Sequence, residues 1–138
     1  MAVSIGVLKN IFIFIANTLF SICMVKRKIT KLEKLKFKPF KKYGDPIKGW
    51  TWHNISFNKK TNFGTYISKL EPGTKTIKHI HEGYEEFLIL DGELIDSDGK
   101  IFKKGDIVSY KPQSNHSSYT KKGCLILTFM KGSNKPIK

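Results

Sequence analysis

Cysteine is scarce in this chain, with only two in 138 residues. Cys23 lies in an apolar N-terminal stretch, and Cys124 begins an apolar run that continues through residues 125–127. Two cysteines in such unlike places do not predict a disulfide, which suits a reducing compartment. The apolar neighbours favour Cys124 as a small core residue rather than a nucleophile.

Acidic residues are also few, with 11 Asp and Glu against 25 Lys and Arg, for a formal net charge of +14. The excess is concentrated in residues 26–42, where nine basic residues accompany only Glu33. A run of this kind is typical of a solvated segment, although it can also attract anionic lipid or nucleic acid. Because it lacks interleaved aromatic residues that would stack on bases, we expect no nucleic-acid partner.

Helical periodicity is missing after Tyr43, and short β-rich runs alternate with turn residues instead. Asp98-Gly99 is a hairpin signal, and Asp91-Gly92 predicts a turn or bulge that breaks a strand. Repeated short strands at this spacing predict an all-β sandwich or barrel of the jelly-roll kind. The expected strands are Trp50–Phe57, Phe63–Leu70, Lys75–His81, Glu86–Ile95, Lys100–Phe102, Gly105–Tyr110, His116–Thr120 and Gly123–Met130.

The N-terminal segment has two interpretations. Residues 5–25 are mostly apolar and about as long as the ~20 residues that span a bilayer, which predicts a membrane anchor. Alternatively, Met24 is the true start and residues 1–23 are upstream sequence. Either interpretation places the folded part in the cytoplasm. The predicted organisation is an apolar segment at 1–25, a basic linker at 26–45 and one folded domain at 46–138.

Histidine is rare as well, and three of the four histidines fall into one pattern. His79 and His81 are two residues apart, so on a strand both side chains point to the same face. Glu85 follows closely, and His116 comes from a later strand. Imidazole with one carboxylate suits Fe, Mn, Ni, Cu or Zn, so the sequence predicts a mononuclear metal site built on strands.

The same residues carry a resemblance to a known family. The run from Gly73 to Gly92 matches the first cupin motif at Gly73, His79, His81, Glu85 and Gly92. The run from Gly105 to His116 is similar to the second cupin motif, with one extra residue before Pro112 and Ser114 in place of the usual glycine. The chain thus resembles the cupin superfamily over roughly Trp50 to Lys131. It is most similar to small single-domain cupins such as the cupin-like half of zinc-binding anti-sigma factors and related dioxygenases.

This resemblance implies one divalent metal ion per chain, whether Fe, Zn, Mn or Ni, held by His79, His81, Glu85 and His116. Glu86 fits a looser form of the first motif, but Glu85 is preferred because the spacing to Gly92 works only from it. The resemblance to small cupins also implies a homodimer, in which edge strands of the two chains would pair.

Two functions follow from a cupin metal site. The first is a metal-dependent enzyme, dioxygenase-like, that acts on a small oxygenated substrate; the second is a non-catalytic zinc or small-ligand binding or sensory module. An enzyme needs an apolar pocket with a few polar groups around its metal. Phe87 and Ile89 share a strand face with Glu85, and Phe129 and Tyr110 are further candidates for contact with a substrate. No catalytic residue beyond the metal ligands can be named from the sequence.

Overall fold

The computed structural model describes residues 26–41 and 43–137. The two interpretations of the N-terminal segment, a membrane anchor or a mis-assigned start, concern residues outside these ranges. Within the described part of the chain, no helix combines the length and the apolar character needed to cross a bilayer.

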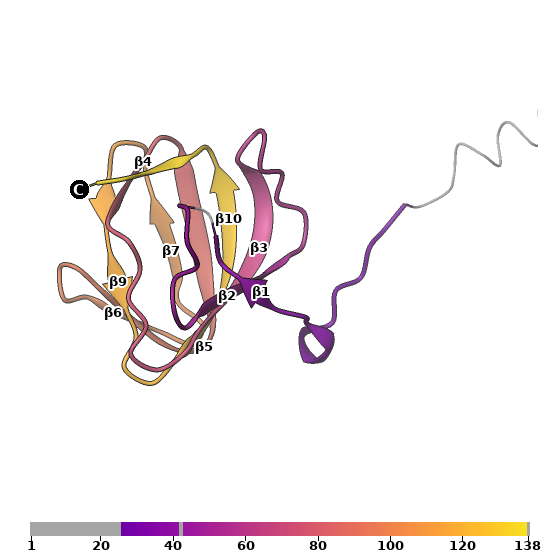
Figure 1. The fold of residues 1–138 in the computed structure, drawn as a ribbon, viewed down its shortest axis with the longest axis horizontal. Coiled ribbons are helices and arrows are strands. Elements are labelled where there is room, and N and C mark those ends of the chain that lie inside the picture. The colour runs from indigo at the N-terminus through magenta and orange to yellow at the C-terminus, as the bar shows by residue number, and fades with distance from the viewer. Residues whose placement is uncertain (1–25, 42, 138) are drawn as a thin grey trace, which may run out of the picture. The chain divides into compact units, whose positions relative to one another are not determined.

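Antiparallel strands make up almost all of the regular structure between Lys31 and the C-terminus (Figure 1). The single helix of the described residues is a 3-10 turn, η1, at Leu32–Lys34. The strands are β1 Lys38–Pro39, β2 Trp50–Asn54, β3 Phe63–Leu70, β4 His79–His81, β5 Tyr84–Asp96, β6 Ile101–Lys103, β7 Ile107–Tyr110, β8 Asn115–His116, β9 Ser118–Tyr119, β10 Cys124–Lys131 and β11 Asn134–Pro136.

These strands form two sheets that face each other across the core, as in a jelly-roll barrel. The larger sheet has the order β1-β2-β3-β10-β5-β6, with β7 and β9 also paired to β5, and the smaller sheet has the order β11-β4-β8. The core between them is rich in aromatic and branched side chains, including Trp50, Tyr66, Phe87 and Ile89. The predicted all-β barrel of the jelly-roll kind is therefore confirmed.

Strand β5 bears out one of the two alternatives predicted at Asp91-Gly92, a turn or a bulge. The pair makes no turn, because the strand continues through it to Asp96. The register with β10 instead shifts at this point, so that Ile89 pairs with Ile126 and Asp91 with Leu125. The pair thus adjoins a β-bulge at Leu90, which has no partner on β10, and Gly92 has a φ of +77° that a side chain would strain.

The basic segment is also more integrated than a linker at residues 26–45. Lys38–Pro39 pairs with β2, and the buried Phe40 ring stacks on Trp50 with 4.0 Å between the centroids. The folded unit consequently begins well before residue 46. The apolar contacts of this segment come from side chains that lie between its lysines, namely Leu32, Leu35, Phe37 and Phe40. The high charge of the segment made these apolar residues easy to overlook in the sequence.

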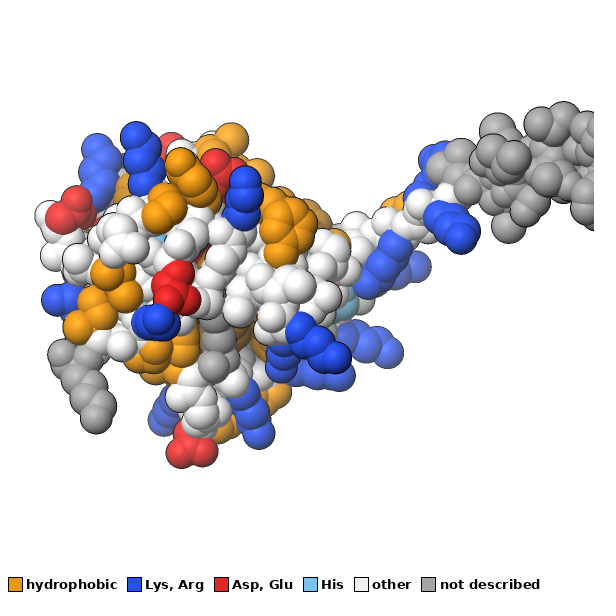
Figure 2. Space-filling model, turned by 90° about the horizontal axis from the view of Figure 1, so that it is seen from above, with side chains coloured by type: hydrophobic (Ala, Val, Ile, Leu, Met, Phe, Trp, Pro, Cys, Tyr) orange, Lys and Arg blue, Asp and Glu red, His pale blue; other side chains and the backbone are white. Residues whose placement is uncertain are grey.

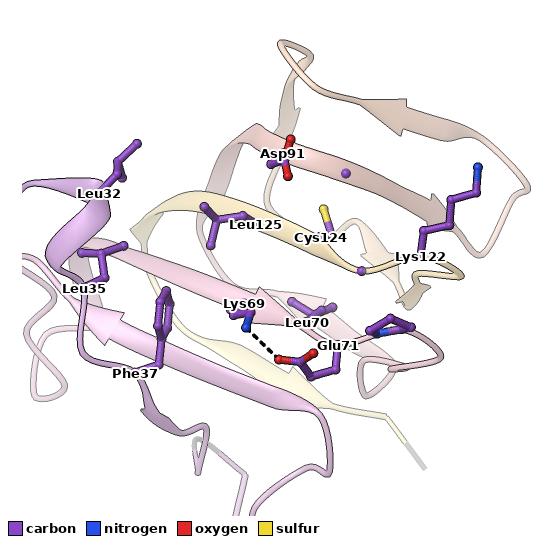
Figure 3. Close-up of a pocket in the computed structure, with 13 residues that line it drawn as sticks. Leu32, Leu35, Phe37, Lys69, Leu70, Glu71, Asp91, Lys122, Cys124 and Leu125 are labelled. Carbon is purple, nitrogen blue, oxygen red and sulfur yellow. Dashed lines mark ion pairs between the residues drawn. The ribbon is translucent and has the colours of Figure 1, made fainter.

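Residues 32–37 of this segment lie over the outer face of the large sheet. Leu32, Leu35 and Phe37 line a cavity of about 430 Å³ together with Leu125 of β10 (Figure 3). Cys124 lies at the same place and belongs to the hydrophobic core, as the sequence predicts. Burial, followed by the charges of Asp91 and Glu93, raises the pKa of the Cys124 thiol to about 12.

Candidate metal centre

Three strands bring four potential metal ligands together inside the barrel. On β4, His79 and His81 are both buried while Ile80 between them is only partly buried, which is the alternation expected of a strand. His116 of β8 pairs directly with His79 across the antiparallel ladder. Glu85 enters from the start of β5 and is also buried. One donor atom from each of these four residues lies within 4.8 Å of the others.

The distances suit a common ion. The Nε2 atoms of His79 and His81 are 3.0 Å apart. Two nitrogens each about 2.1 Å from one ion are about 3.0 Å apart when they subtend about 90° at it. A carboxylate oxygen of Glu85, Oε2, lies 4.0 Å from Nε2 of His79 and 3.8 Å from Nε2 of His81. These longer separations correspond to wider angles at the same ion.

Each imidazole is oriented through its other nitrogen. Nδ1 of His79 donates to the carbonyl of Ile77 at 2.8 Å. Nδ1 of His81 faces the hydroxyl of Ser114 at 3.2 Å, and that hydroxyl donates its own proton to a backbone carbonyl, so it accepts from the ring. Nδ1 of His116 donates to Asp96 at 3.0 Å. With every Nδ1 protonated, every Nε2 carries a lone pair toward the cluster.

This arrangement fits a metal ion. Nε2 of His116 is fully buried and has no hydrogen-bond partner within the described residues. Two nitrogen lone pairs at 3.0 Å, a third nearby and a carboxylate repel one another unless a cation lies between them. A divalent ion would satisfy all four donors at once, and the partners of the Nδ1 atoms are the outer contacts that metal-binding histidines require.

Glu85 and Glu86 are separated clearly by the strand. Glu85 faces the cluster, where the side-chain amide of Asn134 on β11 donates to Oε2 at 2.6 Å. Glu86 is exposed and accepts a hydrogen bond from Ser109. Burial acts to raise the pKa of Glu85, but in the metal-free site the attraction of His79, when that ring is protonated, the hydrogen bond from Asn134 and the attraction of the two other histidines outweigh it, so that this pKa is lowered. Glu85 is therefore held as a carboxylate.

Asp96 is a functional residue that the sequence did not reveal. It lies at the end of β5 and is 6% exposed. Its carboxylate accepts hydrogen bonds from His116, from the hydroxyl of Ser118 at 3.2 Å and from the hydroxyl of Tyr110. Burial acts to raise the pKa of Asp96, but the hydrogen bonds from His116, Tyr110 and the backbone of Ser97 lower it to about 2. The residue thus stays charged and holds the His116 ring in place.

A small cavity of about 40 Å³ adjoins His79, Glu85 and His116. The wall includes the hydroxyl-bearing side chains of Tyr43 and Tyr66. Burial and then the charge of Glu85 raise the pKa of both tyrosines well above its usual value, so both remain neutral donors. Sequence reasoning missed Tyr43, because it lies in the basic segment with no motif around it.

The predicted substrate-contacting residues have different places. Phe87 lines this cavity, whereas Ile89 packs in the core beside it. Tyr110 lies against the histidines, with its ring centroid 4.1 Å from that of His116. Phe129 does not reach the site: it lies on the opposite face of β10 from Thr128 and contacts the exposed Phe63 instead. The prediction for Phe129 is therefore wrong. Side chains alternate along β10, so the buried Thr128 and Met130 face inward and Phe129 between them faces outward.

His53, the fourth histidine, is not part of the ligand cluster. It lies on β2, where Nδ1 donates to the carbonyl of Lys36 at 3.0 Å. It therefore has a structural role in attaching the basic segment to the barrel.

Comparison with known proteins agrees with this geometry. Residues 25–133 match the family described as the ChrR cupin-like domain. No curated protein matches the sequence.

Several solved structures share the fold. A putative acetylacetone dioxygenase from Methylibium petroleiphilum PM1 has a TM-score of 0.69 at 15% identity, covering 83% of each chain. An acetylacetone dioxygenase from Acinetobacter johnsonii has a TM-score of 0.64 at 19% identity, covering 84% of this chain and 83% of that one. The polyketide cyclase RemF from Streptomyces resistomycificus has a TM-score of 0.66 at 18% identity, covering 82% and 87%.

Proposed function

Because the chain belongs to the ChrR cupin-like domain family, we propose that it is a metal-dependent cupin enzyme, dioxygenase-like, that acts on a small oxygenated substrate. One divalent ion per chain would be held by His79, His81, Glu85 and His116. The observation that carries the proposal is the convergence of three Nε2 lone pairs and one carboxylate, each oriented by its own hydrogen-bond partner.

The ligand set leaves room for chemistry. Four protein donors on an ion that prefers six leave two positions, and the ion would then act as a Lewis acid or exchange electrons with oxygen. The hydroxyl groups of Tyr43 and Tyr66, which the raised pKa keeps protonated, lie in the wall of this cavity beside the ligand cluster. The apolar side chains of Phe87, Leu94 and Ile126 around them exclude water. Two of the fold neighbours named above are acetylacetone dioxygenases, which makes a small diketone a sensible first probe.

The proposal can be tested in two steps. Elemental analysis of the purified full chain should find one divalent ion per chain, and His116→Ala should lose it. The protein loaded in turn with Fe(II), Mn, Ni and Zn is then assayed for oxygen consumption with acetylacetone. Consumption that requires the metal supports an enzyme, whereas the absence of stoichiometric metal in the wild type would refute the site itself.

The alternative is a non-catalytic zinc or small-ligand binding module. The cavity of about 40 Å³ favours it, since a drug-sized ligand fills several hundred Å³ and this space holds only a few small atoms. A tightly held zinc ion, with no turnover after exchange for Fe(II), would favour the module over the enzyme.

A further inference from the structure

A large groove lies beside the metal cavity and is lined by the basic segment and by β2. Its volume is about 740 Å³, which is in the range of small-molecule binding sites. Its lining includes four lysines and no acidic residue; they are Lys36, Lys38, Lys41 and Lys59. In Figure 2 one group of Lys and Arg side chains lies at the right of the barrel, and others are scattered over the rest of the visible face.

The lysines of this groove are held in position through the backbone. Lys38 pairs with Trp52 in the β1–β2 ladder, and the backbone N–H of Phe40 donates to the carbonyl of Trp50 at 3.0 Å. The hydrogen bond from His53 to the carbonyl of Lys36 holds the segment two residues before Lys38. The charge of a segment that looked like a solvated linker is thereby concentrated along one side of a cavity.

No acidic side chain of the described residues neutralises the positive charge of the groove. The ion pairs of the described residues involve other lysines, and none of the four groove lysines has an acidic partner there. Like charges along a partly enclosed groove repel one another, and low-dielectric walls strengthen the field. A bound anion would relieve this repulsion, so charge complementarity points to an anionic occupant.

The groove also has an aromatic wall. Trp52 is held by edge contacts with Phe40, Tyr66 and Phe57, at centroid distances of 6.0, 5.7 and 6.3 Å. The ammonium of Lys59 lies 5.4 Å from the centre of the Trp52 ring. A fixed indole with a cation beside it can accept a flat ring and the acidic group attached to that ring.

Two residues form a wall that the groove shares with the metal site, so the two hollows are adjacent. Phe40 and Tyr66 line both the groove and the cavity beside His79, Glu85 and His116. From these observations we infer that the groove binds the planar, anionic part of the substrate, an aromatic or conjugated carboxylic or phosphoric acid. This inference rests on the proposed function, because it assigns the groove and the metal cavity to one substrate.

Single-stranded nucleic acid is the competing occupant, since it too is anionic and stacks on aromatic rings. The groove offers one accessible tryptophan rather than the series of rings that a strand needs, and its volume is that of a small molecule. A small organic acid is therefore the better match.

The test is calorimetric titration of the metal-loaded full chain with matched probes. Benzoate and phenyl phosphate carry both the ring and the charge, benzamide carries the ring alone, and inorganic phosphate carries the charge alone. We expect the ring-bearing anions to bind at least about fivefold more tightly than either control, with an affinity that falls as salt rises. A short single-stranded oligonucleotide is titrated in parallel.

Three variants locate the binding. Lys38→Gln combined with Lys59→Gln should weaken benzoate binding by about fivefold or more, and Trp52→Leu should weaken it by about tenfold. Lys104→Gln is the matched control, because Lys104 is exposed, pairs with Asp91 and lies outside the groove. Elemental analysis should show that none of these variants loses the metal.

The outcomes separate this inference from the proposed function. Benzoate binding that depends on Trp52 supports the inference even if no metal-dependent turnover is found. Equal binding of benzoate, benzamide and phosphate would overturn it, as would an equal loss with Lys104→Gln. Tight binding of the oligonucleotide with no binding of the acids would overturn it in favour of nucleic acid, and metal-dependent oxygen consumption would then still support the enzyme.

Discussion

Asp96 offers the most direct test of how the metal centre is assembled. Its carboxylate accepts the Nδ1 proton of His116 at 3.0 Å and so keeps the lone pair of Nε2 directed at the other ligands. Loss of such an outer partner typically costs 10- to 100-fold in metal affinity. In Asp96→Ala the ring loses its anchor and its charged partner together, so we expect metal affinity to fall by about 100-fold, or about 2.7 kcal/mol.

Asp96→Asn separates the two contributions. An asparagine can still place an oxygen against the His116 Nδ1 proton and its amide against Tyr110, so the ring orientation is kept. Only the negative charge that makes the imidazole a stronger donor is lost. We therefore expect about a tenfold loss, or about 1.4 kcal/mol.

The assay is competition for zinc against a coloured chelator at neutral pH. Asp98→Asn is the matched control, because Asp98 is exposed on the neighbouring hairpin, where its carboxylate accepts only the backbone N–H of Lys100. The reasoning would be refuted if Asp96→Ala bound zinc as tightly as the wild type while His116→Ala did not bind it.

The low pKa of Asp96 also makes a stability prediction for the metal-free protein. A carboxyl whose pKa is lowered by folding from 3.8 to about 2 stabilises the fold above pH 4 and loses that effect as the pH falls toward 2. The difference amounts to at most about 2 kcal/mol, and screening by solvent reduces it. The stability gap between the wild type and Asp96→Asn should therefore close between pH 4 and pH 2 in denaturant titrations.

Three further predictions follow from single contacts. Glu85→Gln should weaken metal binding by about tenfold or more while Glu86→Gln leaves it unchanged, in the same chelator assay, because only the first faces the histidines. Gly83→Ala should lower the free energy of unfolding in urea by more than about 3 kcal/mol, because the new Cβ would lie 1.7 Å from the carbonyl oxygen of Lys131. Gly99→Ala is the control: its Cβ meets no atom within 4 Å, so only its φ of +86° should cost about 1 kcal/mol. Alkylation of Cys124 should be slow at neutral pH and become fast only on unfolding, as measured by peptide mapping, because burial keeps its thiol protonated up to about pH 12.

The strands and the metal cluster were readable from the sequence because both depend on local rules. Period-two alternation places His79 and His81 on one face of β4, and it separates Glu85 from Glu86 on β5. The turn signal at Asp98-Gly99 likewise corresponds to the β5–β6 hairpin. Motif spacing then brought His116 into the same prediction, although nothing local places it there.

Residues that support the ligands escaped prediction because their partners are distant in sequence. Asn134 reaches Glu85 across 49 positions, and Asp96 reaches His116 across 20. Neither belongs to a pattern, since a turn-flanking aspartate and an asparagine after the last expected strand have ordinary explanations. The prediction for Phe129 was wrong for a different reason. Phe129 was chosen because it is aromatic, but its side chain lies on the face of β10 that points away from the histidine cluster.

The metal cavity and the groove are suited to different parts of one substrate. The space beside the histidines, about 40 Å³, is too small for most of a substrate, while the groove of about 740 Å³ holds no metal-binding cluster. Phe40 and Tyr66 belong to both walls, and Phe40 is carried by the same segment that supplies three of the groove lysines. A substrate with its acidic ring in the groove and its oxygen atoms toward the ion would use each hollow for what its residues can bind. The basic segment, which resembles a linker by composition, would then be part of the binding site.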